Sequence, residues 1–234
     1  MQTDWATGLM WYGAFLLSTV LHEAAHAWSA QKLGDDTAAR GGQVTLNPWP
    51  HVRREPFGMV VVPLLSWFAG GWLIGWASAP FNPEWARRYP RSAALMALAG
   101  PAANLLLVVA AAWLIRIGVE WHWLGAPQSI NASRLAVATV PGLWPELAAL
   151  GLSVLLSLNL LLLFFNLLPL PPLDGSNLPL LLLPPAAATR YADALRSPAI
   201  RVIGVLVASR LFSPMFPPLL RLAANLLHPQ HNYH

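Results

Sequence analysis

The residues of this chain best suited to chemistry are His22, Glu23 and His26, which stand in the pattern His-Glu-Ala-Ala-His. An α-helix advances 3.6 residues per turn, so two histidines four positions apart lie on one face and can bind the same zinc ion. Glu23 is then placed to take a proton from a water molecule that attacks a carbonyl. The motif predicts metal-assisted hydrolysis, with two histidine ligands and Glu23 as the general base.

A third metal ligand is expected at Asp174, near the end of the run Asn-Leu-Leu-Pro-Leu-Pro-Pro-Leu-Asp-Gly at residues 166–175. Its three closely spaced prolines cannot continue a helix, so the apolar segment before them should unwind into an extended stretch. An acidic group at the end of such a segment is costly unless it is paired or bound to a metal. Two histidines and one carboxylate form a catalytic zinc shell whose fourth position stays open.

The elements that must position these residues are typical of a membrane protein. Of the 234 residues, 56% are hydrophobic and only 10% are charged, which is unlike a soluble domain. Three segments have the length and apolar character of spanning helices: residues 9–30, 92–115 and 147–168. A fourth, residues 57–81, is interrupted by prolines and glycines, which suits a re-entrant or broken hairpin at least as well as one straight crossing helix.

A short β element is expected after the first helix, because residues 43–46 alternate polar and apolar side chains behind a glycine pair. Its free edge could hold an extended peptide by strand addition, and the alternative is an ordinary interfacial loop. The predicted fold class is thus an all-α polytopic membrane protein with a core of three spanning helices, a broken hairpin and this β element. We expect one membrane-embedded domain over residues 1–234, with a catalytic core at about 7–180 and a C-terminal membrane-associated segment at about 190–234.

Charge indicates the orientation in the membrane. Lys and Arg outnumber Asp and Glu, 14 to 10, but the cations lie mostly in loops beside apolar spans, so we interpret them as topology determinants and expect no nucleic-acid partner. If residues 57–81 return to their starting side, the basic loops share one face, and residues 119–146 hold a single cation, Arg134. The positive-inside rule then places the N-terminus outside and the basic loops in the cytoplasm. The chain has no cysteine, which excludes disulfides and thiolate ligands.

Three motifs together resemble the site-2 protease family of intramembrane zinc metalloproteases: the His-Glu motif at residues 22–26, the Ala-Gly-Pro-Ala-Ala-Asn run at 99–104 and the run at 166–175. Residues 41–48 also look like the segment that follows the zinc helix in many bacterial members. The chain departs from the family where Ser176 and Asn177 follow Gly175, a place where Gly-Arg is frequent.

The resemblance implies one Zn²⁺ per chain, bound by His22, His26 and Asp174, with Glu23 as the general base. It also implies an integral protein of a bacterial cytoplasmic membrane, with the active site toward the cytoplasmic side and transmembrane proteins in the lipid bilayer as substrates. A competing interpretation is a non-hydrolytic membrane metal-binding protein, either a metal-ion transporter or a pseudoprotease scaffold. A transporter has no need of a general base beside its ligands.

Two asparagines have open roles. Asn166 lies eight residues before Asp174, and we expect its amide to donate a hydrogen bond to the substrate carbonyl as negative charge develops there. The alternative is a hydrogen bond that bridges two helices. Asn104 has the same two interpretations, and for it the bridging role is favoured.

Overall fold

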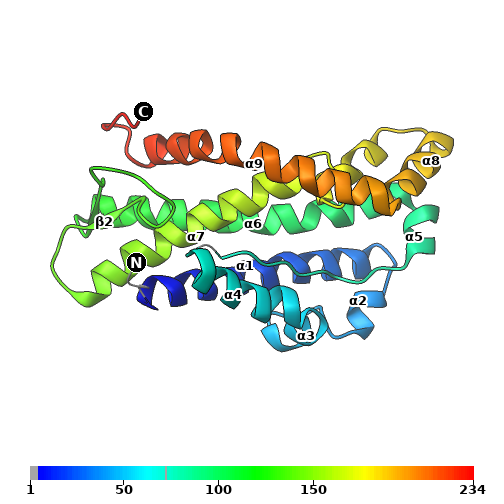
Figure 1. Cartoon of the computed structure of the whole chain (residues 1–234), viewed down its shortest axis with the longest axis horizontal. Coiled ribbons are helices and arrows are strands. Elements are labelled where there is room, and N and C mark those ends of the chain that lie inside the picture. The colour runs from blue at the N-terminus through cyan, green and yellow to red at the C-terminus, as the bar shows by residue number, and fades with distance from the viewer. Residues whose placement is uncertain (1–4, 72) are drawn as a thin grey trace.

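The computed structural model describes residues 5–71 and 73–234. Within this part of the chain, the long helices extend along the same axis of the molecule (Figure 1). They are α1 (Trp5–Lys32), α6 (Pro90–Glu120), α7 (Leu143–Leu167) and α9 (Pro198–Leu227). Helix α6 packs against both α1 and α7, and α9 packs on α7. This arrangement places α6 at the centre, where its residues meet the His-Glu motif of α1.

Two of the described helices, α6 and α7, are long and apolar enough to cross a membrane, with mean hydropathies of 2.0 and 2.4. Helix α9 is bent by 51° between its halves, Pro198–Leu211 and Pro214–Leu227. It is a third such helix if the two halves together form one span. Helix α1 was also predicted to span, and it has 28 residues, but it does not pass the same hydropathy test. The physical reason is that it carries the polar residues of the candidate site, which are buried inside the molecule.

The segment predicted to be a broken hairpin is broken. It begins with a π-helical turn, η1 (Phe57–Val61), continues as α4 (Val62–Gly70) and becomes extended from residue 73 until α5 (Pro83–Arg88). The nine residues of α4 span only about 14 Å, roughly half of a bilayer core. The Trp76 N–H donates to the Gly58 carbonyl over 3.0 Å, so the extended part folds back beside the π-helical turn.

The short strand predicted at residues 43–46 is absent; that prediction was wrong. These residues form an irregular loop between α2 (Thr37–Arg40) and α3 (Pro48–Arg54). Gly42 has a φ of +71°, and the Gln43 N–H donates to the Ala38 carbonyl over 3.0 Å, which turns the chain back on α2. The Asn47 side chain then caps α3. An alternating pattern cannot form a strand where the backbone hydrogen bonds are local and no neighbouring strand is in reach.

The small sheet that the structure does contain lies in the connection between α6 and α7. It pairs β1 (Leu124–Gly125) with β2 (Val137–Ala138) in antiparallel fashion. The largest buried cluster lies beside it, where Ile115 of α6, Leu156 of α7 and Leu220 of α9 meet. This packing fixes the end of the molecule that lies away from the His-Glu motif.

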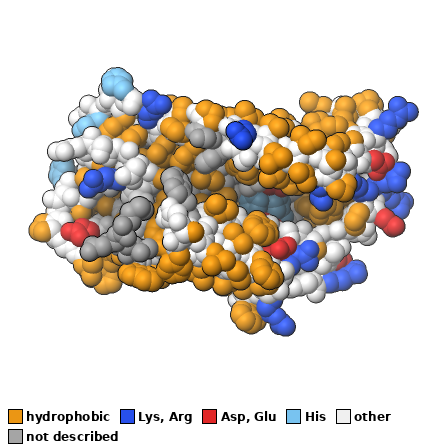
Figure 2. Space-filling model, viewed as in Figure 1, with side chains coloured by type: hydrophobic (Ala, Val, Ile, Leu, Met, Phe, Trp, Pro, Cys, Tyr) orange, Lys and Arg blue, Asp and Glu red, His pale blue; other side chains and the backbone are white. Residues whose placement is uncertain are grey.

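The surface matches a lipid environment. Hydrophobic side chains cover much of the visible face along the helices, and Lys and Arg gather mainly at the end where α5 and α8 (Pro185–Leu195) lie (Figure 2). Large apolar residues such as Leu106, Trp113 and Val202 are exposed on α6 and α9. The structure is therefore mostly helical and consistent with an all-α membrane protein, as predicted.

Candidate metal centre

Helix α1 brings the two histidines of the motif into contact. His22 Nε2 and His26 Nε2 are 2.9 Å apart, and the residues retain only 7% and 5% of their accessible surface. Their i, i+4 spacing puts both rings on the face of α1 that packs against α6. The helix therefore presents two ring nitrogens to the same point in the interior.

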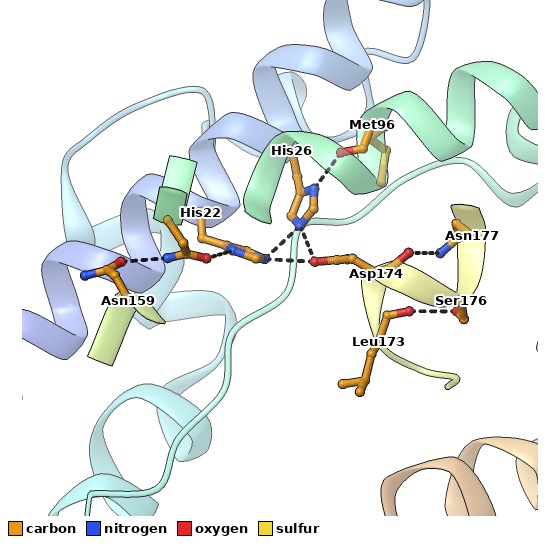
Figure 3. Close-up of polar contacts among 9 residues, drawn as sticks. His22, His26, Met96, Asn159, Leu173, Asp174, Ser176 and Asn177 are labelled. Atoms are coloured by element: carbon orange, nitrogen blue, oxygen red, sulfur yellow. Dashed lines mark hydrogen bonds and ion pairs between the residues drawn. The ribbon is translucent and has the colours of Figure 1, made fainter. Parts of the chain in front are cut away.

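Asp174 approaches that point from another element. Helix α7 ends at Leu167, the proline-rich stretch follows, and Asp174 begins the 3₁₀ helix η2 (Asp174–Leu181). Its Oδ2 lies 3.1 Å from His22 Nε2 and 3.3 Å from His26 Nε2 (Figure 3). The candidate ligand atoms of the three residues lie within 4.8 Å of one another. The structure thus brings together the three residues that the sequence predicted as ligands, although 147 positions separate His26 from Asp174.

The chemistry of these three atoms fits a cation. His26 Nδ1 is 2.8 Å from the Met96 carbonyl oxygen, which can only accept, so this nitrogen carries the proton and Nε2 of the neutral ring carries a lone pair. Asp174 Oδ2 is buried and has no hydrogen-bond partner among the described residues. Acceptor atoms that converge in this way repel one another unless a proton or a cation lies between them, and a metal ion can bind all three.

Helix α6 keeps the space beside these atoms open with a glycine. A Cβ atom added at Gly100 would collide with Nε2 of both His22 and His26. Gly100 belongs to the Ala-Gly-Pro-Ala-Ala-Asn run at residues 99–104, one of the three motifs of the family resemblance. This glycine faces the candidate metal position.

Glu23 is 6% exposed and follows His22 directly in α1. Within residues 5–71 and 73–234, its carboxylate has neither a hydrogen-bond partner nor an ion-pair partner. A buried carboxylate that makes no hydrogen bond to the described residues and lies near enough to His26 to interact with its charge is suited to proton transfer.

The two asparagines are placed differently from each other. Asn166 lies in the last turn of α7, half-buried, and its side chain makes no hydrogen bond to the described residues. Asn104 is fully buried, and its Oδ1 lies 2.6 Å from His22 Nδ1. Sequence reasoning missed Asn159, which hydrogen-bonds Asn104 from α7. The available signal was a second amide in the largely apolar segment that also contains Asn166, because polar side chains in a spanning helix mark functional candidates.

Comparison with known proteins identifies the family. Residues 11–208 match the model of peptidase family M50. The chain belongs to family M50. This family includes the site-2 proteases, so the resemblance seen in the sequence is confirmed.

Relatives within family M50 carry names consistent with this assignment. The chain is 34% identical over 180 residues to "Putative zinc metalloprotease YwhC" of Bacillus subtilis, a match that covers 76% of this chain and 71% of that protein. It is 30% identical over 161 residues to "Putative zinc metalloprotease Rip2" of Mycolicibacterium smegmatis and 31% identical over 169 residues to that of Mycobacterium tuberculosis. These matches cover 69% and 71% of this chain but only about half, 52% and 54%, of the mycobacterial proteins. No solved structure matches the chain.

Zinc is therefore the metal that the M50 family and the names of its members indicate, and the cluster of His22, His26 and Asp174 is a possible site for it. Membership also supports a membrane metalloprotease, in agreement with the apolar helices α6 and α7.

Proposed function

We propose that this M50 protein is an intramembrane zinc metalloendopeptidase that hydrolyses peptide bonds within or near the transmembrane segments of other membrane proteins. The observation that carries the proposal is the convergence of His22 Nε2, His26 Nε2 and Asp174 Oδ2 beside Glu23, inside a helical bundle with an apolar exterior. The motif at residues 22–26 and the motif at 166–175 are distant in sequence, and they meet at this cluster.

The roles follow from the chemistry of each side chain. His22, His26 and Asp174 would hold one zinc ion, which supplies a Lewis acid and makes water a better nucleophile. Glu23 takes the proton of the attacking water and then delivers it to the leaving amine. Burial of Glu23 keeps bulk water from competing for that proton.

The substrates we propose are transmembrane segments that unwind locally. A peptide bond inside a helix is protected by its neighbours and its own hydrogen bonds, so attack requires an extended segment. The site lies six residues before Lys32, the last residue of α1, which corresponds to a depth on the order of 10 Å at 1.5 Å per residue. We propose that this end of α1 faces the cytoplasm of a bacterial cell and that the whole chain forms one domain.

The deciding experiment compares cells that carry the wild-type chain or Glu23→Gln. Membrane proteins that accumulate uncut with Glu23→Gln are the substrates, and the purified variant should retain its zinc because Glu23 is not a ligand in this scheme. Glu146→Gln, at an exposed position of α7, is the matched control and should cleave normally. Equal cleavage products from wild type and Glu23→Gln, or none from either, would contradict the protease assignment and support a transporter or a scaffold.

A further inference from the structure

We propose that Asn159 and Asn104 are positioning residues that fix the tautomer of His22, so that its Nε2 presents a lone pair to the metal. This inference rests on the proposed metal site and adds a function for side chains outside it. The three residues form a line of hydrogen bonds from α7 through α6 to α1 (Figure 3).

The direction of this line is set at its far end by a backbone carbonyl. Asn159 Nδ2 lies 2.8 Å from the Leu155 carbonyl oxygen, one turn earlier in α7. A carbonyl can only accept, so the amino group of the Asn159 amide must point to it. The same amino group reaches Ser18 Oγ of α1 over 2.8 Å. The remaining atom of the amide, Oδ1, is thereby turned toward Asn104.

Each following contact is then determined. Asn159 Oδ1 accepts from Asn104 Nδ2 over 2.8 Å, so Asn104 turns its own Oδ1 to His22. This oxygen lies 2.6 Å from His22 Nδ1 and must accept from it. Nδ1 of the neutral ring therefore carries the proton, and Nε2 carries the lone pair that faces Asp174. A constraint in α7 thus decides which ring nitrogen of α1 can bind metal.

Burial makes the constraint effective. Ser18, Asn104 and Asn159 are all 0% exposed, so bulk water cannot replace a lost partner. A reversed Asn159 amide would bring its oxygen against the Leu155 carbonyl and its amino group against that of Asn104. Both contacts are repulsive, so the reversed arrangement is excluded.

The other histidine does not depend on such a line. His26 Nδ1 donates directly to the Met96 carbonyl, and a main-chain acceptor cannot be reversed by rotation of a side chain. Substitutions in the line should therefore act on zinc binding through His22 alone.

The test measures zinc affinity of the purified full chain by competition with a chelator, together with its melting temperature. Asn159→Leu removes the orienting group with a side chain of similar shape, and we expect zinc to bind about 10- to 100-fold more weakly, the usual effect of losing such a partner. Asn104→Asp keeps an acceptor toward His22 Nδ1, and in its protonated form the other carboxyl oxygen can donate to Asn159 Oδ1 as the Asn104 amide does. Without Asn159, either oxygen of the carboxyl can still accept from His22. Zinc affinity of Asn104→Asp should therefore stay near wild type, and adding Asn159→Leu to it should not weaken binding further.

Ser157→Ala is the matched control, because Ser157 is a fully buried polar residue of α7 whose Oγ has no hydrogen-bond partner among the described residues. It should leave zinc affinity unchanged. The proposal is overturned if Asn159→Leu binds zinc as wild type does, or if it loses the same affinity in the Asn104→Asp background, since that loss would reflect packing alone. Failure of wild type to bind zinc, or binding that survives His22→Ala, would instead refute the metal site itself.

Discussion

At the level of single residues, the candidate centre is a set of acceptor atoms, and hydrogen bonds to the Nδ1 atoms of both histidines fix the directions of their Nε2 atoms. The Met96 carbonyl holds His26, the amide of Asn104 holds His22, and Asp174 meets them with a buried oxygen. These hydrogen bonds leave the two imidazole rings little freedom to rotate. The site is therefore preorganised to bind a cation.

The first prediction concerns the ligands. His26→Ala and Asp174→Ala should each lose most of the zinc that wild type carries at about one ion per chain, because two remaining ligands hold zinc weakly. Metal analysis of the purified chains measures this directly. His231→Ala, at an exposed position of the C-terminal tail, should keep its zinc. Full occupancy in Asp174→Ala would remove Asp174 from the site.

Gly100 provides a second prediction. Its substitution by alanine would place a Cβ against Nε2 of both histidines, whose rings cannot turn away without breaking their Nδ1 hydrogen bonds. We expect Gly100→Ala to bind zinc at least about 10-fold more weakly, as judged by chelator competition. Gly13→Ala is the control, since a Cβ there meets nothing within 4 Å, and unchanged zinc affinity in both variants would show that the rings have room to move.

Asn166 remains a predicted catalytic residue. Its side chain has no hydrogen-bond partner among the described residues, which favours a role toward substrate over a bridge between helices. Asn166→Ala should keep zinc and melting temperature but lower kcat by about 10²- to 10³-fold with little change in KM. Single-turnover rates on the same preparation measure this. Normal turnover, or a lower melting temperature with normal turnover, would assign Asn166 to structure.

At the scale of elements, the extended stretch before α5 is held at its far end by Asp35. The Asn82 N–H donates to Asp35 Oδ2 over 2.7 Å, and the Thr37 N–H donates to Oδ1 over 3.0 Å. Burial raises the pKa of Asp35. The two backbone hydrogen bonds, the hydrogen bond from the Thr37 hydroxyl and the nearby charge of Arg40 lower it by more, so the net pKa lies below its usual range. The ionised carboxylate is thus the form that fastens the stretch.

This lowered pKa predicts a pH dependence. Because the folded-state pKa is below the unfolded value of about 3.9, the stabilisation is present above that pH and is lost as pH falls through the folded-state value. The protection factors of the amides in residues 73–82, which compare their exchange with the intrinsic rate at the same pH, should therefore fall on acidification. Asp35→Asn should show fast exchange already at neutral pH, whereas Asp36→Asn, whose side chain is largely exposed, should behave as wild type. Wild-type protection factors in Asp35→Asn, unchanged with pH, would show that Asp35 does not hold this stretch in place.

At the scale of the whole molecule, the ends of α6 test the orientation. This helix has 31 residues and is about 45 Å long, which exceeds the apolar core of a bilayer. Arg88 lies just before it and His122 just after it. If α6 spans the membrane, these two residues lie on opposite sides.

The positive-inside rule predicts which side each takes. In a chain with no native cysteine, Arg88→Cys should react with an impermeant thiol reagent only from the cytoplasm, and His122→Cys only from outside. Labelling of intact cells and of inverted vesicles distinguishes the two. The opposite pattern would invert the topology and place the candidate site toward the outer face.

The features that depend on local geometry could be predicted from the sequence. Helical spacing placed His22 and His26 on one face, and prolines ended α7 before Asp174. Glycines and prolines likewise predicted the broken segment at residues 57–81. The alternation at residues 43–46 wrongly predicted a strand. A strand needs a neighbouring strand to accept its hydrogen bonds, whereas this loop forms local ones, such as that from the Gln43 N–H to the Ala38 carbonyl.

The surroundings of the predicted metal ligands depend on how the helices pack in three dimensions. Ser18 and Asn159 are 141 positions apart, and they meet only because α1, α6 and α7 pack together. The same packing selects Asn104 as the partner of His22 and turns Gly100 toward both rings. No periodicity along one helix predicts which residue of another will face it, because that choice depends on how side chains from all three helices fill the same space.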